Sequence, residues 1–174
     1  VSRETRPTDA LVITFGRFHA GTAVNIIPDT AQLDGTIRSL SPALLQTAPA
    51  RFKALVEGIA AAHGARAGVA LVPGYPVTVN DADASHYVAR VAHKLSRARQ
   101  VVPDYEPVLA SEDFAFYQLA RPGAFYFLGS RPADRPTVPS LHHPKFDYND
   151  DLLPLAIEMH SELARHFAAG WRQP

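Results

Sequence analysis

Residues 11–39 read LVITFGRFHAGTAVNIIPDTAQLDGTIRS, and this stretch decides the fold of the first half of the chain. Apolar residues alternate with small or polar ones from Ala10 to Phe18 and again from Ala31 to Ser39. A period of two is typical of a half-buried strand. We therefore predict two strands, joined by a loop that begins at HAGTA and continues from Asn25 to Pro28.

A helix and a further extended segment follow these two strands. Ser41 and Pro42 form a helix start, because a hydroxyl caps the first amides and proline needs no hydrogen bond at the first helical position. Apolar residues at helical spacing then predict a helix over 42–63, ended by His63 and Gly64. Residues 69–79 alternate again, although two prolines favour an edge strand or a bend. The first eighty residues therefore read β-β-α-β.

A domain boundary is predicted after Asp81, where a cap and turn signal precedes a second amphipathic helix. Beyond this helix we expect a helical turn at SEDFAFYQLA (111–120), an apolar strand at AFYFLGS (124–130) and a proline-rich loop over 131–144. A final helix is expected from Asn149–Asp151 to Gly170.

Composition narrows the class of protein. The chain has 174 residues, 47% of them hydrophobic, and equal numbers of basic and acidic residues, 17 each. Disorder, nucleic-acid binding and attraction to an anionic membrane are therefore disfavoured. The polar opening VSRETRP is no signal peptide, and no apolar run reaches the roughly 20 residues of a membrane span. We expect a soluble cytoplasmic protein whose natural start lies upstream, since no initiator Met is present.

The pair His142–His143 is the strongest chemical signal among the residues themselves. It lies in LHHPKFDYNDD, an irregular loop with several carboxylates that leads into a helix. Cysteine is absent, so histidine and carboxylates are the strong metal ligands that the chain offers. Adjacent side chains in an extended loop point to opposite sides, so one of the two at most is expected to face a given metal. The alternative is a pair of surface histidines in a polar loop.

Further polar residues suggest a binding site. Glu112 and Asp113 cap the predicted turn at SEDF or form the polar floor of a site. Arg38 has the fork that grips a carboxylate, and Asn25 lies beside the same strand, although an exposed strand arginine is the commoner case. His19, in FHAGT, is a donor to a developing oxyanion or an inert loop residue.

Five segments, taken in order, resemble the latter part of M20-family amidohydrolases. They are FHAGTAVNIIPDTAQLDGTIRSL, PVTVND, ASEDFAFY, RPGAFYFLGS and LHHPKFDYNDD, and together they span nearly the whole chain. The nearest branch is the hippurate and N-acyl-amino-acid hydrolases. The resemblance implies an α+β chain in which residues 1–81 are the later part of a ferredoxin-like lid that lacks its first strand and helix. Residues 82–174 would be the carboxy-terminal part of an α/β zinc-peptidase-like catalytic domain.

The resemblance also implies site residues, a cofactor and partners. His142, which follows the leucine of LHHP, would ligate one of two zinc or manganese ions of an intact subunit. Lid residues Asn25 and Arg38 would bind the carboxylate or scissile carbonyl of an N-acyl amino acid, with Glu112 and Asp113 on the catalytic side. His19 matches a family histidine, although a double glycine is replaced by Ala20-Gly21. The lid would form a homodimer.

The remaining family ligands and the general base have no counterpart in this sequence, so the 174 residues alone are expected to be inactive. A rival reading is a non-catalytic α+β module that binds a ligand or dimerises through an exposed strand edge. An RNA-binding α+β domain is disfavoured, because the chain has no basic excess and no glycine-and-aromatic contact strand.

Overall fold

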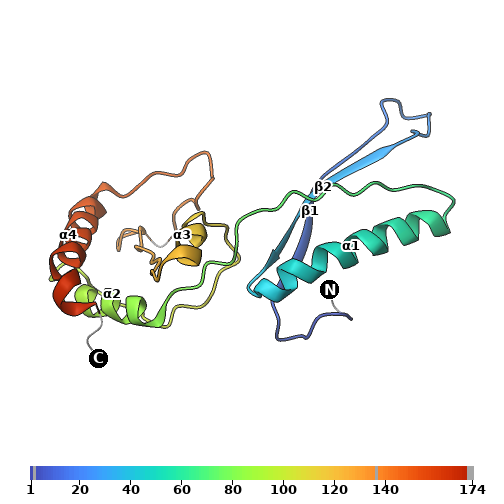
Figure 1. The fold of residues 1–174 in the computed structure, drawn as a ribbon. Coiled ribbons are helices and arrows are strands. Elements are labelled where there is room, and N and C mark those ends of the chain that lie inside the picture. The colour runs from blue at the N-terminus through green and yellow to red at the C-terminus, as the bar shows by residue number, and fades with distance from the viewer. Residues whose placement is uncertain (2, 136, 172–174) are drawn as a thin grey trace. The chain divides into compact units, whose positions relative to one another are not determined.

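An antiparallel hairpin of β1 (Leu11–Ala20) and β2 (Ala31–Ser39) forms the sheet of this computed structural model, which describes residues 1, 3–135 and 137–171 (Figure 1). Leu11 pairs with Ser39 at one end and Ala20 with Ala31 at the other. A bulge leaves Gly16 as an extra residue between Phe15 and Arg17. Both predicted strands are confirmed.

Helix α1 (Pro42–Ala62) follows β2 and confirms the predicted helix. The Ser41 hydroxyl accepts a hydrogen bond from the Leu44 amide at 3.4 Å, and Gly64 has a φ of +72° just beyond the last turn. Phe52 packs against Phe15 of β1, with ring centroids 6.1 Å apart. The loop end of the hairpin diverges from α1 (Figure 1), so side chains of that end are exposed.

The third strand predicted over 69–79 is not formed. No residue in this range has a strand partner within the part of the chain that the structure describes. Pro73 and Pro76 offer no backbone donor, and a strand exists only where a neighbouring strand pairs with it. The segment is therefore extended chain without a ladder.

A helical core organises the second half. Helix α2 (Ala82–Lys94) begins at Asp81, whose carboxylate accepts from the Ala84 amide at 2.9 Å. The short 3-10 helix η1 (Asp150–Leu152), capped by Asn149, leads into α4 (Leu153–Gly170). Both predicted helices are confirmed. The buried residues between α2 and α4 are Tyr87, Val91, Leu95 and Met159.

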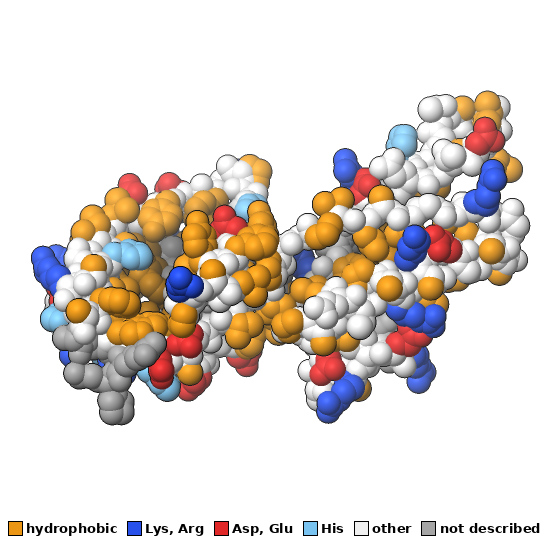
Figure 2. Space-filling model, in the orientation of Figure 1, with side chains coloured by type: hydrophobic (Ala, Val, Ile, Leu, Met, Phe, Trp, Pro, Cys, Tyr) orange, Lys and Arg blue, Asp and Glu red, His pale blue; other side chains and the backbone are white. Residues whose placement is uncertain are grey.

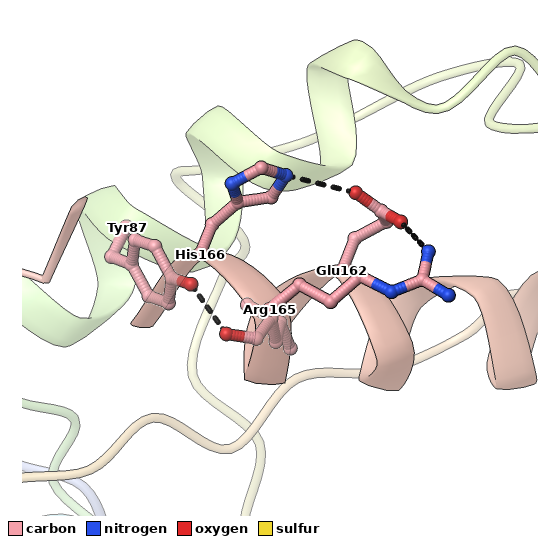
Figure 3. Close-up of polar contacts among 5 residues, drawn as sticks. Tyr87, Glu162, Arg165 and His166 are labelled. Atoms are coloured by element: carbon pink, nitrogen blue, oxygen red, sulfur yellow. Dashed lines mark hydrogen bonds and ion pairs between the residues drawn. The ribbon is translucent and has the colours of Figure 1, made fainter. Parts of the chain in front are cut away.

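The Tyr87 hydroxyl fastens α2 to α4. It donates to the Leu163 carbonyl at 2.5 Å, and Figure 3 shows it pointing at the backbone of α4. Burial raises the pKa of this hydroxyl from its ordinary value of 10.0, so the folded chain favours the neutral phenol. The stability due to this preference is present below about pH 10 and is lost as the pH rises through the raised pKa.

Replacing Tyr87 by phenylalanine should therefore change the pH dependence of stability as well as its size. We expect Tyr87→Phe to lower the free energy of unfolding by about 1 kcal/mol near neutral pH, because the Leu163 carbonyl loses its donor. The variant should also lose less stability than the wild type between about pH 8 and about pH 10.5. Urea unfolding at both pH values measures this difference, and an equal alkaline loss in both proteins would contradict it.

A helical turn and an unpaired segment complete this half. Helix α3 (Phe114–Ala120) confirms the turn predicted at SEDFAFYQLA. The strand predicted over 124–130 was wrong, because no strand among the described residues pairs with it. The Asn80 side chain pairs with the backbone of Phe125, as a neighbouring strand would do. Its amide nitrogen donates to the Phe125 carbonyl and its oxygen accepts from the Phe125 amide, both at 2.8 Å.

Gln118 extends this amide network. It donates to the Asn80 oxygen at 2.9 Å and accepts from the Val79 amide at 3.0 Å. We expect Asn80→Ala to lower the free energy of unfolding by about 2 kcal/mol, because three hydrogen bonds are lost together. Asn25→Ala, in an exposed loop, is the matched control and should change stability by no more than about 0.5 kcal/mol. Equal values for the two variants in urea unfolding would show that the network contributes nothing.

The chain divides into two units. The first contains Val1–Val77 and Pro107–Asp113, and the second contains Thr78–Glu106 and Phe114–Pro174. The division at Val77 lies close to the boundary predicted after Asp81. Residues 107–113, which we call the crossing segment, were predicted in the second domain but group with the first unit. The assignment of the units to a lid and a catalytic domain stays a prediction.

Within the described residues, no helix is both long and apolar enough to cross a membrane.

Candidate functional site

His142 occupies the third position of a tight turn. The turn runs from Ser140 to His143 and is closed by a hydrogen bond from the His143 amide to the Ser140 carbonyl at 3.1 Å. His142 has a φ of +69°, in the left-handed region that residues other than glycine seldom adopt. Such strained conformations cost on the order of 1–3 kcal/mol each, and they cluster at active sites and ligand-binding segments. The exposed ring of His142 makes no hydrogen bond to any described residue.

His143 has a different, local role. Its ring Nδ1 accepts from the Lys145 amide at 3.0 Å, and its carbonyl accepts from the Phe146 amide at 2.8 Å. These bonds fix the loop that follows the turn. The two histidines are therefore distinct: the ring of His143 bonds within its own loop, whereas the ring of His142 does not bond to any described residue. The assignment of His142 as a metal ligand stays a prediction.

The described residues do not complete a metal site around His142. They contain no group of three or more histidine, aspartate or glutamate side chains arranged to hold a metal ion. A hydrolytic zinc site commonly uses three protein ligands and one open position. The described residues therefore fit a metal centre only as contributors of part of its ligand set.

Two of the predicted substrate-binding residues lie at the loop end of the hairpin. His19 pairs with Gln32 near the end of β1, and Asn25 lies in the turn of the connecting loop. Gly21 enters this loop with a φ of +70°. Both His19 and Asn25 are exposed.

Arg38 lies at the opposite end of the same hairpin, paired with Val12. A strand rises by about 3.4 Å per residue, so Arg38 is roughly 20 Å along β2 from the position of Gln32. A small N-acyl amino acid is shorter than this separation. Within one hairpin, a small ligand that contacts Arg38 is therefore too short to contact His19 and Asn25 as well.

The structure does bring Arg38 to the crossing segment. Arg38 Nη1 donates to the Leu109 carbonyl at 2.9 Å and to the Ser111 hydroxyl at 3.3 Å. Glu112 is half-buried and Asp113 exposed in the residues that follow. The sequence did not predict the partners of Arg38, because they lie 71 and 73 positions away, beyond any local spacing rule.

A charged cluster on α4 was also not predicted. Glu162 accepts from Arg165 Nη1 at 2.7 Å and lies 3.0 Å from His166 Nε2 (Figure 3). The hydrogen bond from Arg165 lowers the pKa of Glu162, and the bond to His166 adds to this effect. Spacings of three and four residues place the three side chains on one helix face and would have identified them. In this cluster Arg165 and His166 are exposed and Glu162 is half-buried, and its ion pairs stabilise the helix slightly.

Comparison with known proteins identifies the family. The family model described as "Peptidase family M20/M25/M40" matches residues 5–166, which is most of the chain. The chain belongs to this family. The finding confirms the M20 resemblance drawn from five ordered motifs.

Named M20 relatives match almost the whole chain. IAA-amino acid hydrolase ILR1-like 4 of Arabidopsis thaliana is 33% identical over 171 residues, covering 96% of this chain and 39% of the relative. N-acetylcysteine deacetylase of Bacillus subtilis (strain 168) is 33% identical over 168 residues, covering 94% of this chain and 41% of the relative. The M20 chain described here thus spans about two fifths of the length of these curated relatives.

A solved M20 structure has a similar fold. The Bacillus subtilis YXEP protein, described as a dinuclear metal binding peptidase, matches with a TM-score of 0.71 and 32% identity. The match covers 88% of this chain and 41% of that chain. It confirms the predicted α+β fold class.

Proposed function

We propose that this M20 chain forms part of a metal-dependent hydrolase that cleaves the amide bond of N-acyl amino acids, with hippurate-like compounds among its substrates. The observation that carries the proposal is the turn at His142, which presents an exposed imidazole from the family motif LHHP in a strained backbone conformation. The names of the relatives support the reaction class, since they include an amino acid conjugate hydrolase and a deacetylase.

The proposed cofactor is a pair of divalent ions, zinc or manganese, as the dinuclear description of the YXEP protein suggests. Imidazole and carboxylate ligands suit both metals. His142 would supply one ligand. Ligands and a general base from outside these 174 residues would complete the site, because the described residues contain no metal-binding group of three.

The proposed substrate-binding residues fall into two groups. Arg38, Glu112 and Asp113 form one group, joined by the contact between Arg38 and the crossing segment. His19 and Asn25 form the other, at the loop end of the hairpin. Within the first group, we propose that Arg38 binds the carboxylate or the scissile carbonyl of a substrate, since a guanidinium binds carboxylates through paired hydrogen bonds. Glu112 and Asp113 would line the catalytic side.

We further propose a cytoplasmic homodimer that binds neither nucleic acid nor membranes. Zero net charge agrees with the last two points. The loop end of the hairpin supports dimerisation, because it exposes large apolar side chains that a partner would cover (Figure 2). Four of them are Phe18, Val24, Ile26 and Ile27, with exposed fractions of 65% or more.

Because the described residues contain no metal-binding group of three, we keep a second candidate function for the 174 residues by themselves. In isolation they would act as a ligand-binding or dimerisation module without catalysis. A saturable response to an N-acyl amino acid without added metal would favour this module.

An assay of a full-length protein that contains this sequence tests the proposal. Metal-loaded protein should hydrolyse one or more of hippurate, N-acetyl amino acids and indole-acyl amino acids, and a chelator should abolish turnover. Added zinc or manganese should restore it. If the protein cleaved none of the three classes, or if turnover survived chelation, the proposed reaction would be refuted.

A further inference from the structure

The crossing segment has no secondary structure to hold it in place. Residues 107–112 lie in neither helix nor strand, yet they group with the first unit while the chain on both sides groups with the second. A segment without a hydrogen-bond ladder depends on side-chain contacts for its position. The contacts of this segment therefore decide where Glu112 and Asp113 lie.

Arg38 supplies two such contacts through one nitrogen. Its Nη1 donates to the Leu109 carbonyl at 2.9 Å and to the Ser111 hydroxyl at 3.3 Å. Leu109 and the arginine are both half-buried, so the charge-assisted bond between them is partly shielded from water. These contacts hold the chain immediately before Glu112.

Arg38 lies at the end of the hairpin that buried residues and side-chain hydrogen bonds hold in place. The neighbouring Ser39 is buried, donates to the Ala10 carbonyl at 2.6 Å and accepts from the Ser41 amide at 3.0 Å. Leu11, which pairs with Ser39, is also buried. Side chains that start from a rigid element position their partners more accurately than side chains on loops.

We infer that Arg38 is a positioning residue: it holds the crossing segment against β2 and thereby sets the place of Glu112 and Asp113. The consequence for catalysis rests on the proposed function, but the mechanical claim does not. Arg38 would act through the segment that it holds, in addition to any direct contact with a ligand.

Proteolysis of the 174-residue chain tests the mechanical claim without any assay of activity. An endoprotease that cleaves after glutamate should cut after Glu112 about tenfold faster in Arg38→Ala than in the wild type, since cleavage follows the population of the opened segment. Cleavage after Glu57, within α1, is the internal reference and should not change. Arg38→Lys should show an intermediate rate, because a lysine keeps the charge and loses the fork.

Two further variants act as controls. Arg17→Ala removes an exposed ion pair with Asp34 on the same hairpin and should leave cleavage after Glu112 unchanged. Ser111→Ala should accelerate cleavage less than Arg38→Ala, since the bond to Leu109 remains. Equal cleavage after Glu112 in Arg38→Ala and the wild type would overturn the inference. So would an equal rise after Glu57, which would mean general unfolding.

Kinetics of the full-length enzyme separate positioning from direct binding of a carboxylate. With hippurate and its primary amide as probes, a positioning role predicts that Arg38→Ala lowers kcat/KM for the amide as well as for hippurate. Ser111→Ala should cause a smaller loss in the same parameter. A loss confined to hippurate, with no effect of Ser111→Ala, would assign Arg38 to the carboxylate alone. A wild-type enzyme that cleaves neither probe would refute the proposed function and leave the proteolysis result to decide the inference.

Discussion

His142→Ala should lower kcat/KM for N-acyl amino acids by about 10³-fold or more in a full-length M20 enzyme that contains this chain. Loss of one metal ligand disturbs charge stabilisation worth several kcal/mol, and each 1.4 kcal/mol corresponds to a factor of about ten in rate. The measurement is steady-state hydrolysis at saturating metal. His143→Ala is the matched control and should cost no more than about 10- to 100-fold, because that ring supports the loop through the Lys145 amide.

The substitution His142→Gly distinguishes the loss of the imidazole ligand from the relief of backbone strain. Glycine adopts positive φ without steric cost, so His142→Gly should keep or raise the thermal stability of the metal-free protein. Its activity should nevertheless fall as far as that of His142→Ala. Retained activity in both variants would exclude His142 as a ligand, and a larger effect of His143→Ala would mean that the two histidines have been assigned the wrong way round.

Gly35→Ala should cause the largest loss of stability among the single substitutions considered. A Cβ at this position would lie 2.3 Å from the Thr14 carbonyl oxygen and 3.0 Å from a ring carbon of Phe15. The closer atom belongs to the backbone of the paired strand, so the sheet itself must shift at the bulge. We expect the free energy of unfolding to fall by at least about 2 kcal/mol.

Gly16→Ala is the control for this prediction. Gly16 is the extra residue of the same bulge, and a Cβ there would meet nothing within 4 Å. We expect a change within about 0.5 kcal/mol, measured by urea unfolding that follows the signal of the hairpin. Similar losses for the two variants would show that glycine is needed for chain flexibility and not for the close approach to Thr14.

The helices and the hairpin were predictable because their signals are local. Ser41 with Pro42, and Asp81 before α2, are capping residues that act within one turn of their own position. The alternation over 11–39 is likewise decided by neighbours in sequence. Each of these elements has the bounds expected from the sequence to within a few residues.

The extended segments were not predictable in the same way. Residues 69–79 and 124–130 have strand-like alternation, but a strand also needs a partner that no local pattern supplies. For Phe125 the partner is the side chain of Asn80, which the sequence identified only as a capping and turn residue. An alternating pattern shows that a segment favours the extended conformation, but it does not show whether another strand lies beside it to pair.

The candidate site was predicted in part. The family motif selected His142, but its positive φ and the local bonds of His143 are properties of the folded turn. Arg38 was selected for the chemistry of its fork, and its attachment to Leu109 and Ser111 depends on tertiary structure alone. The register of the hairpin also separates Arg38 from His19 and Asn25, which the sequence had grouped around one substrate.

Metal stoichiometry tests the central claim most directly, namely that this chain contributes one ligand, His142, to the two-metal site of an M20 hydrolase. Elemental analysis would compare full-length wild-type protein with His142→Gly after incubation with zinc or manganese and removal of free metal. The account predicts two tightly bound ions in the wild type and the loss of one or both in the variant. Two ions retained by His142→Gly would contradict it.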